Sequence, residues 1–135
     1  MSRLNHMNTT EKSVETKGKK RKVCFVITSK IHYARNKLVL QALRDHPGIE
    51  LQIIIGGSAL IDKYGNAEAD IVADGFSINA RFLMSLEGGS TVAMAKSAGI
   101  GLLELPTIFE NLKPDIVLVR GDRYEVLSVA IAAAY

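Results

Sequence analysis

The sequence is poor in the residues that build disulfide or metal scaffolds. Its 135 residues include a single cysteine, Cys24, and no Cys/His spacing typical of a zinc site. A disulfide framework and a zinc fold are therefore excluded, and we expect no metal site. Because Cys24 lies among strand-forming residues, its thiol is expected to be buried and unreactive.

Long hydrophobic runs are also missing. No uninterrupted apolar run approaches the roughly 18 residues that a membrane span requires, and the first residues lack the apolar stretch of a secretory signal. We therefore expect a cytoplasmic protein without a membrane partner. The apolar share of 47% still suits a globular fold, and 135 residues are enough for one domain with a buried core.

Two glycine-rich phosphate-binding motifs are absent as well. No Gly-x-Gly-x-x-Gly follows the first strand-like run, and the pair Gly99 and Gly101 lies in a helical pattern without a third glycine. No Gly-x-x-x-x-Gly-Lys-Ser/Thr occurs either. A dinucleotide or other cofactor is therefore not expected. An anionic ligand would have to be bound by helix N-termini and by cationic side chains.

Positive charge is concentrated at the amino terminus. Residues 1–22 contain seven basic and two acidic residues, a net charge of +5, whereas residues 23–135 contain ten basic and twelve acidic residues, a net charge of −2. Nucleic-acid binding depends on a cationic face, so we expect no nucleic-acid partner for the second part. The basic run 17–22 could act as a localisation or polyanion-binding tag, but the polar composition of residues 1–22 favours a disordered leader.

Four strand-like segments follow this leader. Continuous β-branched runs predict buried strands at 23–28, 51–55 and 115–120. Segment 76–82 alternates with period two, as a strand near a sheet edge does.

Helical patterns separate and follow these strands, at 34–46, 60–74, 94–112 and 124–135. The second helix should be broken near Gly65 and stopped by Gly75 in a left-handed conformation. Ser90 or the residue after it should cap the third helix, in which Pro106 predicts a kink or the start of another helix.

The alternation of strands and helices predicts an α/β fold, a Rossmann-like doubly wound parallel sheet over residues 23–135. In the usual strand order 3-2-1-4, the first and fourth strands are neighbours, and ligands bind in the crevice at their carboxyl ends. The loops 29–33 and 121–123 would line that crevice.

Five polar residues in or next to these loops are the candidate site residues: Asp122, Lys30, Arg123, His32 and Glu125. Asp122 could cap the last helix, or it could transfer a proton or orient a substrate hydroxyl. Lys30 and Arg123 could contact an anionic diphosphate. Each of the four other than Asp122 could also be an ordinary solvated residue of a turn or first helical turn. The pattern alone predicts anion binding without specifying a reaction.

Five segments occur in register with a known family: 28–33 (TSKIHY), 57–65 (GSALIDKYG), 73–76 (ADGF), 112–115 (LKPD) and 121–125 (GDRYE). Through them, residues 22–135 resemble the amino-terminal domain of the hydrolysing UDP-N-acetylglucosamine 2-epimerases, enzymes that feed sialic acid synthesis. The resemblance implies a glycosyltransferase-B-like fold of two domains with the active site between them. It also implies that this chain is truncated, with the second domain beyond Tyr135.

The resemblance further implies a reaction that needs no metal or redox cofactor. The proton at C2 of the sugar is removed as UDP leaves C1, and water then adds to the resulting 2-acetamidoglucal to give N-acetylmannosamine. Asp122 falls on the family's acid/base or substrate-orienting carboxylate, and Arg123 on a UDP contact. The full-length form is expected to be a homo-oligomer, and the chain alone is expected to be inactive and to expose apolar sheet surface.

Three positions depart from the family pattern. Lys30 replaces an arginine, and a lysine offers a mobile point charge instead of a planar fork of donors. His32 stands where an acidic residue is usual, and Ala34 where relatives can carry serine. The sugar therefore stays open between UDP-N-acetylglucosamine and a UDP-diacetamido sugar of legionaminic-type acid synthesis. The chain could instead be a non-catalytic nucleotide-sugar-binding module or a glycosyltransferase donor domain.

Overall fold

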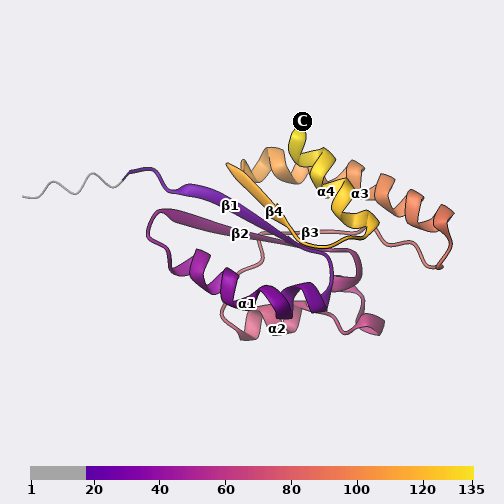
Figure 1. Cartoon of the computed structure of the whole chain (residues 1–135), viewed down its shortest axis with the longest axis horizontal. Coiled ribbons are helices and arrows are strands. Elements are labelled where there is room, and N and C mark those ends of the chain that lie inside the picture. Colours follow the sequence, from indigo (N-terminus) through magenta and orange to yellow (C-terminus); the bar gives the residue numbers. More distant parts are fainter. Residues whose placement is uncertain (1–17) are drawn as a thin grey trace, which may run out of the picture.

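The computed structural model describes residues 18–135 as one parallel sheet with two helices on each face (Figure 1). The strands are β1 (Arg21–Ile27), β2 (Ile49–Gly56), β3 (Ala80–Phe82) and β4 (Ile116–Val119). The helices are α1 (Lys30–Asp45), α2 (Glu68–Ala73), α3 (Thr91–Leu112) and α4 (Tyr124–Ala134), with 3-10 turns η1 (Gly57–Leu60) and η2 (Asp62–Tyr64). Most of the predicted leader lies outside the described residues.

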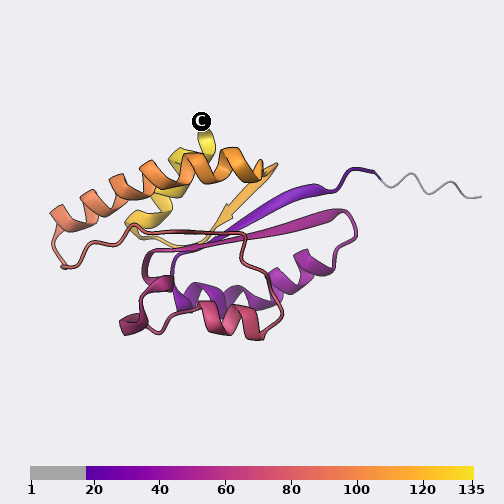
Figure 2. The same cartoon turned by 180° about the vertical axis from the view of Figure 1, so that it is seen from behind.

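The sheet has the predicted order, β3-β2-β1-β4, and every pair of neighbouring strands is parallel. The predicted doubly wound α/β fold is therefore confirmed. α1 and α2 cover one face of the sheet and α3 and α4 the other, as the view from behind also shows (Figure 2). This arrangement follows from right-handed crossovers between parallel strands.

The two faces bury separate clusters of side chains, because alternate residues of a strand point to opposite faces. Phe25 and Ile27 of β1 pack toward α1 and α2, whereas Cys24 and Val26 pack toward α3 and α4. Cys24 is fully buried, and burial raises its pKa to about 12. The thiol stays protonated at neutral pH, as expected for the unreactive cysteine predicted from the sequence.

The structure corrects the start of the first helix. α1 begins at Lys30, not at residue 34, and Ser29 is its N-cap. The Ser29 hydroxyl oxygen accepts a hydrogen bond from the backbone N–H of His32 at 3.3 Å, which satisfies one of the free donors of the first turn. Lys30 and His32 are therefore helical residues and not loop residues.

The second predicted helix is only partly correct. Its first half forms η1 and η2, and only Glu68–Ala73 is α-helical. Gly65 and Gly75 have positive φ angles of 74° and 80°, so the predicted break and the predicted stop are both confirmed.

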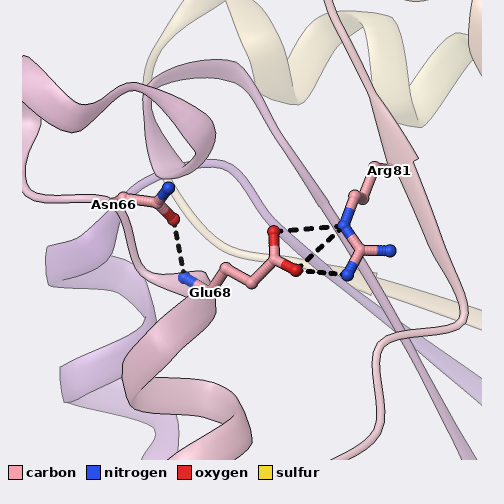
Figure 3. Close-up of polar contacts among 3 residues, drawn as sticks. All are labelled: Asn66, Glu68 and Arg81. Atoms are coloured by element: carbon pink, nitrogen blue, oxygen red, sulfur yellow. Dashed lines mark hydrogen bonds and ion pairs between the residues drawn. The ribbon is translucent and has the colours of Figure 1, made fainter.

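An ion pair between Glu68 and Arg81 connects α2 to the edge strand β3 (Figure 3). The Glu68 carboxylate accepts hydrogen bonds from Arg81, with Arg81 Nε at 3.2 and 3.1 Å from its two oxygens, and Asn66 Oδ1 accepts the backbone N–H of Glu68 at 2.9 Å. β3 lies at the sheet edge as predicted but is only three residues long. Both charged partners are partly exposed, so solvent screens the ion pair and it contributes little to stability.

α3 runs through Pro106 without interruption, so the prediction of a second helix starting there is wrong. Leu105 and Phe109, on either side of the proline, are buried against the sheet, and this packing offsets the roughly 3 kcal/mol cost of an interior proline. Ser90 caps the helix as predicted. By length and composition alone α3 could also cross a membrane, although Leu105 and Phe109 pack within the fold.

β4 was predicted to be a buried strand, but it is half exposed. Ile116 is 37% exposed, and the other three residues of the strand are only partly buried. β4 lies at the edge of the sheet, so it has one neighbouring strand where an interior strand has two. This exposure agrees with the expectation that the chain alone presents apolar sheet surface.

Candidate functional site

One cleft of about 830 Å³ opens at the carboxyl ends of the strands. All four strands contribute the segment that follows them: Ser29–Ile31 after β1, residues 58–64 after β2, residues 85–89 after β3, and Arg123 with Tyr124 after β4. Carboxyl ends of parallel strands meet at one edge of a sheet, which is why these distant segments converge. The predicted crevice is therefore present.

The starts of α1 and α4 lie in the wall of this cleft. Their free backbone N–H groups and their dipoles favour negative charge. A second concavity, of about 860 Å³, lies at the opposite ends of α3 and α4, beside Asp115 and Tyr135. Helix C-termini favour cations, so an anionic ligand is better placed in the first cleft.

Lys30 and Arg123 line the same cleft although they are far apart in the sequence, as predicted. The Lys30 ammonium lies 2.9 Å from Oδ2 of Asp70, and both side chains are about half exposed. The Arg123 guanidinium lies 3.3 Å from Oε1 of Glu125 and 5.5 Å from the centre of the Tyr124 ring. Each cation thus has one carboxylate partner and an exposed side toward solvent.

Asp122 does not cap α4, so the capping interpretation is wrong. Arg123 occupies the N-cap position, with extended backbone angles and no side-chain capping hydrogen bond. Asp122 is exposed, and within residues 18–135 its side chain has no hydrogen-bond or ion-pair partner. It follows β4 at the same edge of the sheet as the cleft, but it is not one of the residues that line the cleft.

Glu125 is buried, which corrects its reading as an exposed charge of the first helical turn. The residue is 1% exposed. Gly57, the first residue after β2, lies beside it: a Cβ atom on Gly57 would be 3.5 Å from Cγ of Glu125, at ordinary van der Waals distance. Local sequence cannot show this burial, because it depends on the turn after β2 lying beside the start of α4.

His32 lies beside the corner between β4 and α4. Its Nδ1 is 3.2 Å from the Thr28 hydroxyl oxygen, and a Cβ atom on Gly121 would lie 2.8 Å from its Cε1. Gly121 also has a φ of 143°, so both the backbone and the close imidazole require glycine at this position.

Burial is the main cause that lowers the pKa of His32, and the Glu125 carboxylate opposes this shift. Three nearby cations lower the pKa further: Arg120, Arg123 and Arg35. The shift favours the neutral imidazole in the chain without a ligand, so Lys30 and Arg123 are the better candidates for a cationic contact to a diphosphate.

The part of the cleft that follows β2 and β3 was not predicted from the sequence. Ser58 and Tyr64 come from the turns after β2, and Glu87 comes from the loop after β3. These residues follow predicted strands directly, and this position could have placed them in the candidate site, because every parallel strand ends at the ligand-binding edge. Within residues 18–135, no group of three or more His, Cys, Asp or Glu residues could hold a metal ion.

A sequence model of the family described as UDP-N-acetylglucosamine 2-epimerase matches residues 41–135. The chain belongs to this family. The resemblance found in the five sequence segments is thereby confirmed.

Two relatives show how this family member compares with whole enzymes. A Legionella pneumophila protein named UDP-N,N'-diacetylbacillosamine 2-epimerase (hydrolyzing) is 37% identical over 85% of this chain and 30% of the relative. A Campylobacter jejuni protein named GDP/UDP-N,N'-diacetylbacillosamine 2-epimerase (hydrolyzing) is 31% identical over 82% of this chain and 29% of the relative. The chain therefore spans about 30% of the length of these epimerases.

A solved epimerase structure has the same fold. UDP-GlcNAc 2-epimerase from Neisseria meningitidis, bound to UDP-GlcNAc, superposes with a TM-score of 0.67 at 18% identity, over 83% of this chain and 29% of that one. At this level of identity, the likeness establishes the fold.

Proposed function

We propose that the whole protein is a hydrolysing 2-epimerase of a UDP-linked 2-acetamido sugar, and that this chain forms one wall of its active site. The proposal rests mainly on the single cleft in which Lys30, Arg123 and the starts of α1 and α4 meet. Two cations and two helix N-termini suit the diphosphate of a nucleotide sugar. A second α/β domain beyond Tyr135 would close the cleft, and the whole protein would be a cytoplasmic homo-oligomer.

In the proposed reaction, UDP leaves as the sugar loses a proton. The C2–H bond and the C1–O bond to UDP break, and a C1=C2 double bond forms in 2-acetamidoglucal. Water then adds its hydroxyl to C1 and a proton to C2 from the other face, which gives the 2-epimeric sugar. Asp122 would transfer the proton or orient a hydroxyl of the substrate, and Lys30 and Arg123 would stabilise the charge on the departing diphosphate.

The second candidate substrate is UDP-N,N'-diacetylbacillosamine, because the Legionella and Campylobacter relatives carry that sugar in their names. The test incubates the whole protein separately with this sugar nucleotide and with UDP-N-acetylglucosamine, and detects UDP and the free sugar by chromatography. Release of UDP with a 2-epimeric sugar supports the reaction, and the faster substrate identifies the sugar. Binding of either compound without UDP release would favour a non-catalytic binding module. The 135-residue chain alone is expected to show no turnover.

Lys30→Arg is expected to leave the affinity for UDP unchanged or to improve it. Arginine would keep the positive charge and the reach to Asp70, and it adds a second parallel donor for a phosphate. Isothermal titration of UDP into the whole protein measures the effect. The matched control is Lys37→Arg on the same helix, which pairs with Asp74 and lies outside the cleft. A clear loss of affinity for Lys30→Arg alone would show that the diphosphate does not bind at Lys30.

A further inference from the structure

Glu125 is a buried carboxylate with one oxygen left unpaired. Its side chain is 2% exposed, and its Oε1 lies 3.3 Å from Nη2 of Arg123. Its Oε2 is buried and has no hydrogen-bond partner among residues 18–135. Buried carboxylates are normally fully paired, because an unsatisfied charged oxygen loses its hydration without compensation.

A purely structural role does not account for this glutamate. An apolar side chain of similar length would fill the same space beside Gly57 without an unsatisfied oxygen, and the half-exposed Arg123 would remain hydrated without its carboxylate partner. Local violations of the rules of stability are expected at functional sites. The negative charge of Glu125 therefore points to a task beyond packing.

The position and the partners of Arg123 indicate what this task is. Arg123 stands at the N-cap of α4 with an extended backbone, its side chain is half exposed, and it lines the cleft. Its partners among the described residues are the Glu125 carboxylate and the Tyr124 ring. Arg120, another cation near this corner, donates instead to Asn36 Oδ1 at 3.2 Å. Arg123 is therefore the arginine that Glu125 pairs with directly.

We propose that Glu125 is a positioning residue, whose buried carboxylate fixes the Arg123 guanidinium at the wall of the cleft. The guanidinium is then oriented for an anionic ligand before the ligand binds. A long side chain held in place before binding loses less rotational freedom when the ligand arrives. The choice of a UDP ligand rests on the proposed function. The ordering of Arg123 does not, and it is measured without ligand.

The first experiment measures ordering in the isotope-labelled chain 1–135 by NMR. In the wild-type chain, the Arg123 Nε–H order parameter should exceed that of Arg35, an exposed arginine of α1. Equal mobility of the two side chains would overturn the proposal without any variant. In Glu125→Gln, Arg123 should become as mobile as Arg35, because the amide keeps the shape of the carboxylate and removes its charge.

The same spectra report on His32. Because Glu125 opposes the lowering of the pKa of His32, that pKa should fall further in Glu125→Gln. Arg120, Arg123 and Arg35 remain in that variant and continue to lower it. The control is Glu104→Gln, the same chemical change on an exposed residue of α3, which should alter neither readout. If Glu125→Gln keeps Arg123 ordered and His32 unchanged, Glu125 is only a packing residue.

The second experiment titrates UDP into the same chain. Glu125→Gln should weaken binding on the order of tenfold, as expected when a charge-assisted contact loses its orientation. Because Glu125 acts through Arg123, the substitution should add little in an Arg123→Gln background. Equal losses in both backgrounds would overturn the proposal. If the wild-type chain does not bind UDP, the proposed ligand is wrong for this chain, and the ligand-free ordering of Arg123 still decides the role of Glu125.

Discussion

Asp122→Asn is expected to reduce turnover of the whole enzyme by about 10²–10⁴-fold, the contribution typical of a positioned acid or base. The amide keeps the size of the carboxylate but can no longer take up or release a proton. Asp122 does not cap α4 and has no partner within residues 18–135, so its replacement should leave the fold intact. Initial rates of UDP release, compared with thermal unfolding of the same samples, measure both effects.

A matched control for this experiment is Asp45→Asn, an exposed aspartate at the end of α1, away from the cleft. It should change neither turnover nor stability by a measurable amount. Full activity in Asp122→Asn would show that Asp122 neither transfers a proton nor orients the sugar. A parallel loss of stability would instead mean that the aspartate supports the corner between β4 and α4.

Gly56→Ala is expected to lower the free energy of unfolding by on the order of 3 kcal/mol, through overpacking of the core. A Cβ atom on Gly56 would lie 2.2 Å from Cε1 of Phe82, far inside van der Waals contact. Phe82 is 1% exposed and packs with Ile54 and Met84, so its ring has little room to move. Urea denaturation of the chain 1–135, followed by circular dichroism, measures the loss.

Gly99→Ala is the control for that substitution because it makes the same chemical change in open space. No heavy atom lies within 4 Å of the Cβ position of Gly99, which is an exposed residue inside α3. Alanine is favoured over glycine in a helix by about 1 kcal/mol, so this variant should be as stable as the wild type or more so. Similar destabilisation in both variants would contradict the close packing of Gly56 on Phe82.

Much of the fold could be predicted from the sequence, because its main determinants are periodic and local. The apolar run beginning at residue 23 and the one at 51–55 each form a central strand that is buried on both faces. Glycine at 75 stops α2 in the left-handed conformation, and Ser90 caps α3. The extent of several elements differed from the prediction: α1 gained a turn through the Ser29 cap, and the first half of the second predicted helix formed 3-10 turns. α3 continued through Pro106 because its neighbours are buried.

The candidate site was predictable in its place but not in its arrangement. The loops after β1 and β4 do meet, since parallel strands end at one edge, and Lys30 and Arg123 share the cleft. The roles of Asp122 and Glu125 within segment 121–125 were not readable from the sequence. A strand-to-helix corner offers several capping positions, and the backbone conformation placed Arg123 at the cap.

The sequence by itself determined the alternation of strands and helices, the two-faced parallel sheet and the edge at which a ligand would bind. These follow from hydrophobic periodicity and from the chirality of crossovers, which act along the chain. Only the tertiary structure decided that Glu125 is buried beside Gly57, that Lys30 pairs with Asp70, and that β4 is a half-exposed edge. Burial and pairing of a charge depend on which distant segments pack around it, and a linear pattern does not contain that information.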